Sequence, residues 1–220
     1  MNKINQNKST NENISKNIVP VEELTPKQKN HYREMLDSFF KILDEEKIEN
    51  LEDLIKIKPK HKGYVDVTFV CYLVTKFVKP NFMVETGVAR GFSSYATLSA
   101  MEKNRKGKLF SIDFPTTYQD VGWLPRGKFD ENWELIIGKS KDKLPELLDK
   151  LGLIDCFLHD SEHHYENMMF EFKQAWKHLR KGGVIICDEP TNAFYDFIKE
   201  VKPSSSFTIP SRIPEGIIIK

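Results

Sequence analysis

The sequence has 220 residues, of which 40% are hydrophobic and 30% are charged, and its formal net charge is +1. This length suits one domain with a full core, and the balanced charge excludes a general attraction to nucleic acid or membranes. No apolar run approaches the ~18 residues of a transmembrane helix, and the N-terminus lacks a signal-type apolar stretch. We therefore expect a soluble cytoplasmic protein that binds neither nucleic acid nor membrane.

The N-terminal part of the chain divides into a polar tail and a helical region. Residues 1–25 are rich in Asn, Lys and Ser and bury too little apolar surface to fold, so a disordered tail is predicted. Pro26 opens a helical pattern whose apolar residues share one face. The apolar run 64–78 is long enough to favour a buried helix, and Pro80 ends it. We expect one domain over 26–220, with N-terminal helices over 26–78 and a catalytic core over 80–220.

After Pro80, short apolar runs alternate with helical patterns. Strands are predicted at 82–86, 108–113, 133–139, 155–160 and 183–188. Helices are predicted at 93–104, 144–152, 165–179 and 192–201, the third ended by Gly182 and Gly183. Two last apolar pieces, 206–210 and 216–220, are close enough to pair as an antiparallel hairpin. The pattern predicts a Rossmann-like, doubly wound α/β fold with a mostly parallel seven-stranded sheet, a C-terminal antiparallel hairpin and extra N-terminal helices.

Three cysteines, Cys71, Cys156 and Cys187, lie inside apolar runs, far apart and without CxxC spacing. They are interpreted as buried reduced thiols rather than as a disulfide framework or a metal site.

A polar residue stands at or just past the end of each of five predicted strands. These residues are Glu85, Asp113, Ser140, Asp160 and Asp188. The carboxyl edge of an open α/β sheet is where ligands bind, so the five predict one shared crevice. Each residue alone is also a common helix cap.

The turn after the first of these strands, "ETGVARG", has Gly87 and Gly91 four residues apart. A triphosphate loop needs Lys followed by Ser or Thr after its last glycine, and Phe92 stands there. A dinucleotide fingerprint needs glycine where Ala89 and Phe92 stand, which disfavours NAD.

The remaining pattern, Glu85-x-Gly87 with Gly91, resembles the class I S-adenosylmethionine-dependent methyltransferases. In that family the first strand ends in this motif, and an acid at the end of the second, here Asp113, binds the ribose hydroxyls. The resemblance implies a role for Glu85 on the cationic side of the cofactor. It also implies that Ser93, Ser94 and the helix start hold the cofactor's carboxylate.

A second stretch, "HDSEHHYE", resembles the small-molecule branch of that family, whose fourth strand ends in an Asp-x-acid-His-x-Tyr-Glu signature. The signature residues here are Asp160, Glu162, His163, Tyr165 and Glu166. The resemblance covers roughly residues 60–220. It implies a small-molecule acceptor, most simply methylated at oxygen, with His163 as general base, Asp160 beside it, and Ser140 and Asp160 among the cofactor ligands.

Some relatives bind a divalent metal at the ends of the fourth and fifth strands, where this chain has Asp160, Asp188 and Glu189. Such oxygen ligands suit Mg²⁺, although catechol-type relatives have Asn where Glu189 stands. Metal dependence, the identity of the acceptor and a homo-oligomeric state stay open. So do a metal-independent N-methyltransferase, a dinucleotide-dependent oxidoreductase and a non-catalytic cofactor-binding module.

The segment 114–133 is long for a connection between strands and rich in aromatic residues. Such loops are often lids, and Tyr118 and Trp123 are candidates to cover the site. Packing is an equally good reading of Trp123.

Overall fold

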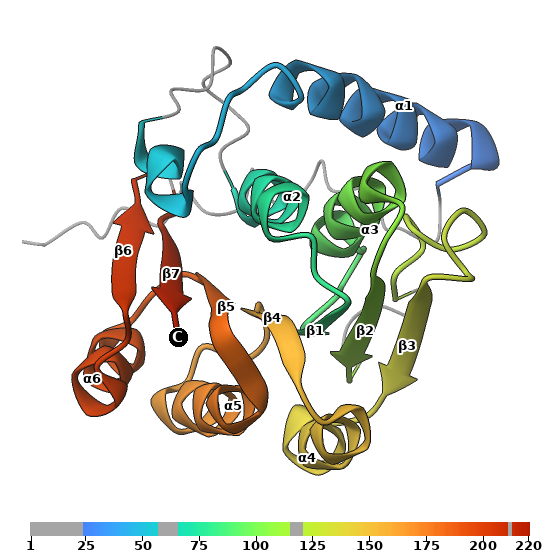
Figure 1. Ribbon diagram of the computed structural model, residues 1–220. Coiled ribbons are helices and arrows are strands. Elements are labelled where there is room, and N and C mark those ends of the chain that lie inside the picture. The colour runs from blue at the N-terminus through green and yellow to red at the C-terminus, as the bar shows by residue number, and fades with distance from the viewer. Residues whose placement is uncertain (1–23, 57–65, 115–120, 211–212) are drawn as a thin grey trace, which may run out of the picture.

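The computed structural model describes residues 24–56, 66–114, 121–210 and 213–220. A central sheet lies between two helix layers, and one further helix covers the outside of the upper layer (Figure 1). None of the helices in these ranges is long and apolar enough to cross a membrane.

The predicted fold class is confirmed, and the described ranges contain seven strands and six α-helices. The strands are β1 (Phe82–Thr86), β2 (Lys108–Asp113), β3 (Trp133–Ile137), β4 (Ile154–His159), β5 (Leu179–Asp188), β6 (Ser205–Ile209) and β7 (Glu215–Ile219). The helices are α1 (Pro26–Leu43), α2 (Val67–Val78), α3 (Phe92–Asn104), α4 (Ser140–Leu151), α5 (Tyr165–His178) and α6 (Asn192–Val201), with a short 3-10 helix, η3 (Leu51–Ile55).

The strand order across the sheet is β3-β2-β1-β4-β5-β7-β6. Neighbours from β3 to β5 pair in parallel, and β7 pairs antiparallel with both β5 and β6, which forms the predicted hairpin. The direction of chain progression reverses between β1 and β4. Ligands bind outside the carboxyl ends of the strands at such a switch point, so the topology points to the ends of β1 and β4.

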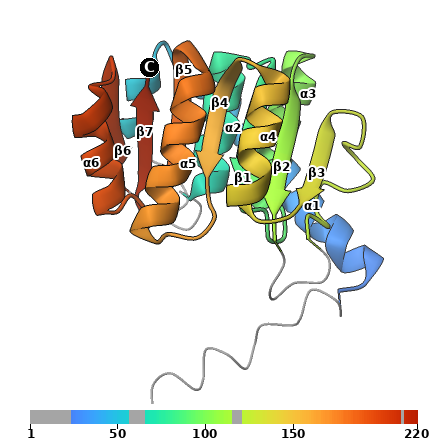
Figure 2. The ribbon, with the colours of Figure 1, turned by 90° about the horizontal axis from the view of Figure 1, so that it is seen from below.

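Both faces of the sheet are buried, as solid apolar strands require. Helices α2 and α3 cover one face, and α4, α5 and α6 cover the other (Figures 1 and 2). In β4, Cys156 and Leu158 belong to the core on the first face, whereas Phe157 belongs to the core on the second. The three cysteines are buried and free, as predicted.

The boundary between α5 and β5 differs from the prediction. The helix ends at His178, and Leu179 already pairs with Ile154 of β4. A register shift between Ile154 and Cys156 then accommodates the two glycines inside β5. Leu179 is buried in either conformation, so its apolar character could not distinguish helix from strand, and the glycines allow the strand to bend rather than ending the helix.

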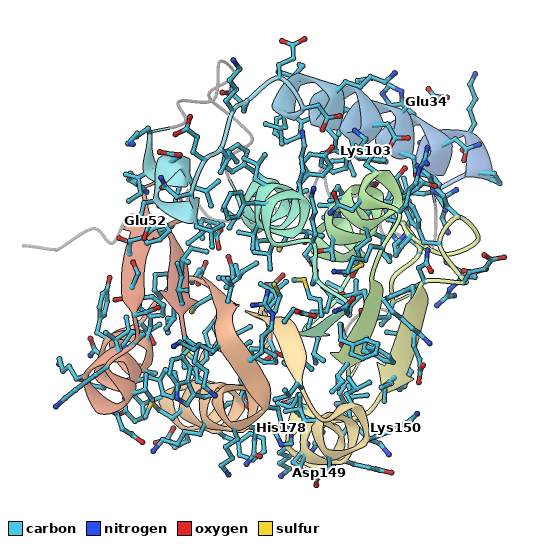
Figure 3. All side chains as sticks on the ribbon, viewed as in Figure 1. Glu34, Glu52, Lys103, Asp149, Lys150 and His178 are labelled. Atoms are coloured by element: carbon cyan, nitrogen blue, oxygen red, sulfur yellow. The ribbon has the colours of Figure 1, made fainter. Side chains whose placement is uncertain are left out.

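The N-terminal elements begin at capping residues. The side chain of Asp66 accepts a hydrogen bond from the Thr68 amide at the start of α2, and Lys79 ends that helix in the left-handed conformation, before Pro80. Lys103 of α3 points toward α1 and forms an ion pair with Asp44, just past the end of α1 (Figure 3). The predicted tail, except for its last two residues, lies outside the described residues.

Helix α1 is fastened to the segment 121–130 by Arg33 and by an ion pair between Asp37 and Lys128. The guanidinium group of Arg33 donates hydrogen bonds to the carbonyl oxygens of Leu124 at 2.8 Å, Arg126 at 2.9 Å and Trp123 at 3.2 Å. The same segment donates backbone hydrogen bonds to Ala89 and Arg90, in the turn after β1. Arg33 therefore links the outer helix to the carboxyl edge of the sheet.

Replacing Arg33 with Met should lower the free energy of unfolding by about 1.5–3 kcal/mol, because three carbonyl groups lose a charged donor while the apolar stem is kept. Urea unfolding followed by circular dichroism measures the change. Lys41→Met, at an exposed position on the same helix, is the control. A loss no larger than that of the control would contradict this role for Arg33.

Candidate active site

The turn between β1 and α3 needs its first glycine because it touches the end of β4. Gly87 has φ +84°, and a Cβ atom there would lie 1.8 Å from the carbonyl oxygen of Asp160. The amide of Asp160 donates to the carbonyl of Thr86 at 2.9 Å, which joins the same two strand ends. Any side chain at position 87 would separate the turn from β4.

Asp113, at the end of β2, holds this turn from the other side. Its Oδ2 atom accepts hydrogen bonds from the amides of Val88 at 2.7 Å and Ala89 at 2.8 Å. Among the described residues no group donates to its Oδ1 atom, so one carboxylate oxygen stays available for a ligand. Ala89 has φ +46°, a left-handed conformation that these two hydrogen bonds help to hold.

A cavity of about 620 Å³ opens at this edge of the sheet. Its wall includes the turn at Gly87, the end of β2 at Asp113, the start of α4 at Ser140, and Asp160 with the residues after β4. Four of the predicted cofactor residues therefore line one cavity. The N-terminus of α4 faces it, which favours a negatively charged or hydrogen-bond-accepting ligand group at that end.

Three further residues predicted to contact the cofactor form a buried network instead of lining this cavity. Glu85 is fully buried and accepts hydrogen bonds from Ser94, from Ser111 at 2.6 Å and, more weakly, from Ser93 at 3.4 Å. Burial raises the pKa of Glu85 to about 7, against the lowering effect of these hydroxyl groups. Roles for Glu85, Ser93 and Ser94 in cofactor binding stay predictions. The last predicted cofactor residue, Gly91, caps the start of α3 with φ +86°.

The predicted catalytic and metal residues gather beside the cavity. Asp160, His163 and Asp188 each offer one ligand atom, and these three atoms lie within 4.8 Å of one another. The Nε2 atom of His163 lies 3.6 Å from Oδ2 of Asp188, and its Nδ1 atom lies 3.6 Å from Oε2 of Glu189. The structure thus brings the carboxyl groups of Asp160, Asp188 and Glu189 close to the imidazole ring of His163, although Glu189 is half-exposed.

Burial and mutual repulsion shape the electrostatics of this cluster. Burial and the neighbouring charge of Asp188 hold the pKa of Asp160 well above its usual range. Burial also raises the pKa of Asp188, although His163 acts in the opposite direction. A cation bound between buried carboxyl groups offsets their mutual repulsion, and carboxylate oxygen atoms suit a hard divalent ion.

Sequence reasoning missed Glu215, the first residue of β7, which pairs with Asp188 across the ladder. It is fully buried, and burial followed by repulsion from Asp188 and Asp160 raises its pKa to about 11. Only the antiparallel register of β7 places it here. Its position after Pro214 at the start of an apolar run carried no signal of its own.

A second missed residue, Glu171 of α5, organises the loop after β4. It bonds to His159 Nδ1 at 2.7 Å and accepts hydrogen bonds from Thr86 at 2.5 Å, Ser161 at 2.8 Å and Asn167 at 3.2 Å. Burial opposes ionisation, yet the hydrogen bond to His159 and the other donors lower the pKa of Glu171. Ser161 and Asn167 line the cavity, so this buried carboxylate positions part of its wall.

The other candidate side chains lie away from the cluster or outside the described residues. His164 is exposed and bonds to Glu162, and His178 bonds to the carbonyl of Gly152. Trp123 is buried and packs edge-on against Tyr32, which favours packing over a lid role. Tyr118, the other lid candidate, lies outside the described residues.

The raised pKa of Glu85 predicts a pH-dependent stability. The folded state holds a proton that the unfolded state releases near pH 4.5, so stability falls as pH rises from 4.5 through about 7. Relative to wild type, Glu85→Gln should therefore gain about 2.5 kcal/mol of unfolding free energy between pH 5 and pH 8. Urea unfolding at both pH values tests this, with exposed Glu146→Gln as control. An equal difference at both pH values would refute it.

Comparison with known proteins gives a match to one family model. Residues 84–189 match a family model described as a methyltransferase domain. No curated protein sequence matches the chain.

Solved structures share the fold at low sequence identity. An O-methyltransferase from Bacillus cereus, in complex with SAH, has a TM-score of 0.61 and 16% identity, covering 84% of this chain and 97% of that one. The O-methyltransferase TomG from Streptomyces achromogenes, involved in tomaymycin synthesis and in complex with SAM, has a TM-score of 0.59 and 15% identity, covering 84% and 96%. These solved structures show that the chain shares their fold.

Proposed function

We propose that this protein transfers the methyl group of S-adenosylmethionine to an oxygen atom of a small-molecule acceptor. One observation carries the proposal: the cavity at the ends of β1, β2 and β4 adjoins a histidine set among carboxyl groups. The O-methyltransferases with the same fold lend further support. The acceptor itself is left unnamed.

The residues of the cavity suit the parts of the cofactor. The free Oδ1 atom of Asp113 is available to accept a hydrogen bond from a ribose hydroxyl, while Oδ2 keeps the turn in place. Asp160 and Ser140 stand in the same wall, within one ligand's span. When bound, the cofactor supplies a methyl group activated by a sulfonium centre.

His163 is the proposed general base. Its Nε2 atom is buried and has no hydrogen-bond partner among the described residues, so it can accept the proton of an acceptor hydroxyl group. The imidazolium that results would lie between Asp188 and Glu189, each 3.6 Å from a ring nitrogen. Those carboxylates would stabilise the charge that appears on the ring.

Asp160, Asp188 and Glu189 are the proposed ligands of a divalent metal such as Mg²⁺. The closeness of Asp160 and Asp188, and the preference of Mg²⁺ for carboxylate oxygens, support this assignment. A bound metal would supply Lewis acidity that lowers the pKa of an acceptor hydroxyl. Without a metal, the same cluster would suit the ammonium group of an amine acceptor, which is the rival reaction.

The cofactor assignment is tested by binding. Isothermal titration should detect S-adenosylhomocysteine, the reaction product, and no comparable binding of NAD. Asp113→Ala should weaken the binding of S-adenosylhomocysteine about tenfold or more, because a ribose hydroxyl loses a charged acceptor.

Asp149→Ala, exposed on α4, is the control, and circular dichroism verifies folding because Asp113 also holds the turn. Unchanged affinity for S-adenosylhomocysteine would show that Asp113 does not bind the cofactor. Tight NAD binding without S-adenosylhomocysteine binding would overturn the methyltransferase proposal in favour of a dinucleotide enzyme.

The role of His163 is tested by turnover. Wild-type protein should move an isotope-labelled methyl group from the cofactor to a small molecule in an extract of the source organism. His163→Ala should lower that rate about 10²- to 10⁴-fold and leave S-adenosylhomocysteine affinity unchanged, because a general base acts only in the chemical step.

Mass spectrometry of the labelled product identifies the acceptor and the methylated atom. Label on nitrogen would favour the amine reaction, and cofactor binding without any transfer would favour a non-catalytic module. Equal losses of rate and of affinity in His163→Ala would indicate a structural role.

A further inference from the structure

We infer that Glu215 is part of the cation site, contributing its carboxylate to the shell of a divalent cation held by Asp160 and Asp188, directly or through a bound water. This inference rests on the proposed metal site of the preceding section. It adds a residue from β7, outside both the matched region 84–189 and the signature after β4.

The sheet register aligns three carboxyl groups. In the parallel pair β4–β5, His159 pairs with Cys187, so Asp160 and Asp188 follow side by side. In the antiparallel pair β5–β7, Asp188 pairs directly with Glu215, and directly opposed residues point to the same face. Neighbouring strands lie about 5 Å apart, so the three groups form a row across β4, β5 and β7.

The carboxyl group of Glu215 lies buried at the β7 end of this row. The residue has 0% of its surface exposed, and among the described residues no amide, hydroxyl or amine group donates to its oxygens, so its hydrogen bond is with the carboxyl group of Asp188. A buried carboxyl group left without such a donor is costly to the folded state. The carboxyl group of Glu215 is therefore suited to bind a cation that enters the site from solution.

A ring nitrogen of His163 lies beside the same carboxyl group, that of Asp188. The Nε2 atom of His163 is buried and lacks a hydrogen-bond partner among the described residues, and it stands 3.6 Å from Asp188 Oδ2, too far for a hydrogen bond. Glu215 and His163 therefore flank Asp188 on two sides. Together with Asp160 they form a cluster of three carboxyl groups and one imidazole ring.

Glu189 occupies a different position. It is half-exposed, its backbone has φ +49°, and its carboxylate pairs with Nδ1 of His163, on the other side of the ring from Asp188. Glu215 thus adds a buried carboxyl group to the proposed site, and Glu189 remains its solvent-facing ligand. Carboxylate-rich sites of this kind suit Mg²⁺ and Mn²⁺.

Two measurements on the full chain test the inference. Metal-free protein is titrated with Mn²⁺ alone by calorimetry, for wild type, Glu215→Gln and the exposed control Glu146→Gln. Glu215→Gln should weaken Mn²⁺ binding about 10- to 100-fold, and the control should match wild type. Urea unfolding in EDTA should give Glu215→Gln a higher midpoint than wild type, because its amide group can donate to Asp188 and one buried acid is removed.

The outcomes separate the possible failures. If wild type binds S-adenosylhomocysteine but not Mn²⁺, the proposed metal site fails and the inference falls with it, whereas the methyltransferase proposal stands. If wild type and Glu215→Gln bind Mn²⁺ equally, the inference alone is overturned. A lower urea midpoint for Glu215→Gln would also overturn it, since Glu215 would then support the fold. Weaker Mn²⁺ binding with a higher midpoint supports it.

Discussion

The close approach of Gly87 to the carbonyl of Asp160 sets the geometry of the whole site. No side chain fits at position 87, so the turn after β1 lies directly against the end of β4. Asp113 then holds that turn through two backbone amides, and the same residue lines the cavity. The proposed cofactor cavity and the proposed catalytic cluster share one wall because of this contact, with Asp160 belonging to both.

Three buried glutamates around this contact differ in how well they are satisfied. Glu85 has serine hydroxyl groups, and Glu171 has a histidine, a threonine, a serine and an asparagine as partners. Both networks are internal and support the turn and the loop after β4. Glu215 is equally buried, and its hydrogen bond is with another acidic group, the carboxyl of Asp188. The least favourably paired of the three glutamates therefore lies where chemistry is proposed, as expected when stability is traded for function.

The helices outside the core also act on the site through specific contacts. Arg33 of α1 donates to three carbonyl groups of the segment 121–130, and that segment donates to the turn after β1. Trp123, in the same segment, packs against α1 and is buried. The N-terminal helix therefore supports the wall of the cavity from outside the helix layers, through backbone carbonyl groups of the segment and through the side chains of Trp123 and Lys128.

Much of the fold was predictable because apolar runs and turn residues are local signals. The strands β1 and β2 and the helix α6 match the predicted bounds, since each lies between strong breaks in the pattern. Polar residues after strands predicted a shared edge, because parallel strands end on one side. The glycine spacing predicted which ligand classes the turn disfavours.

Only the tertiary structure decided how those residues are used. Glu85, the last residue but one of β1, and Asp160, the first residue after β4, both stand near a strand end, yet Glu85 lies inside a serine network and Asp160 borders the cavity. An apolar residue such as Leu179 fits the pattern of a helix or of a strand, and Leu179 is part of a strand because it pairs with Ile154 of β4. Glu215 lies 27 residues beyond Asp188, and the antiparallel register of β7 alone brings it opposite. Local sequence determines which elements form, whereas contacts distant in sequence determine which carboxyl groups meet.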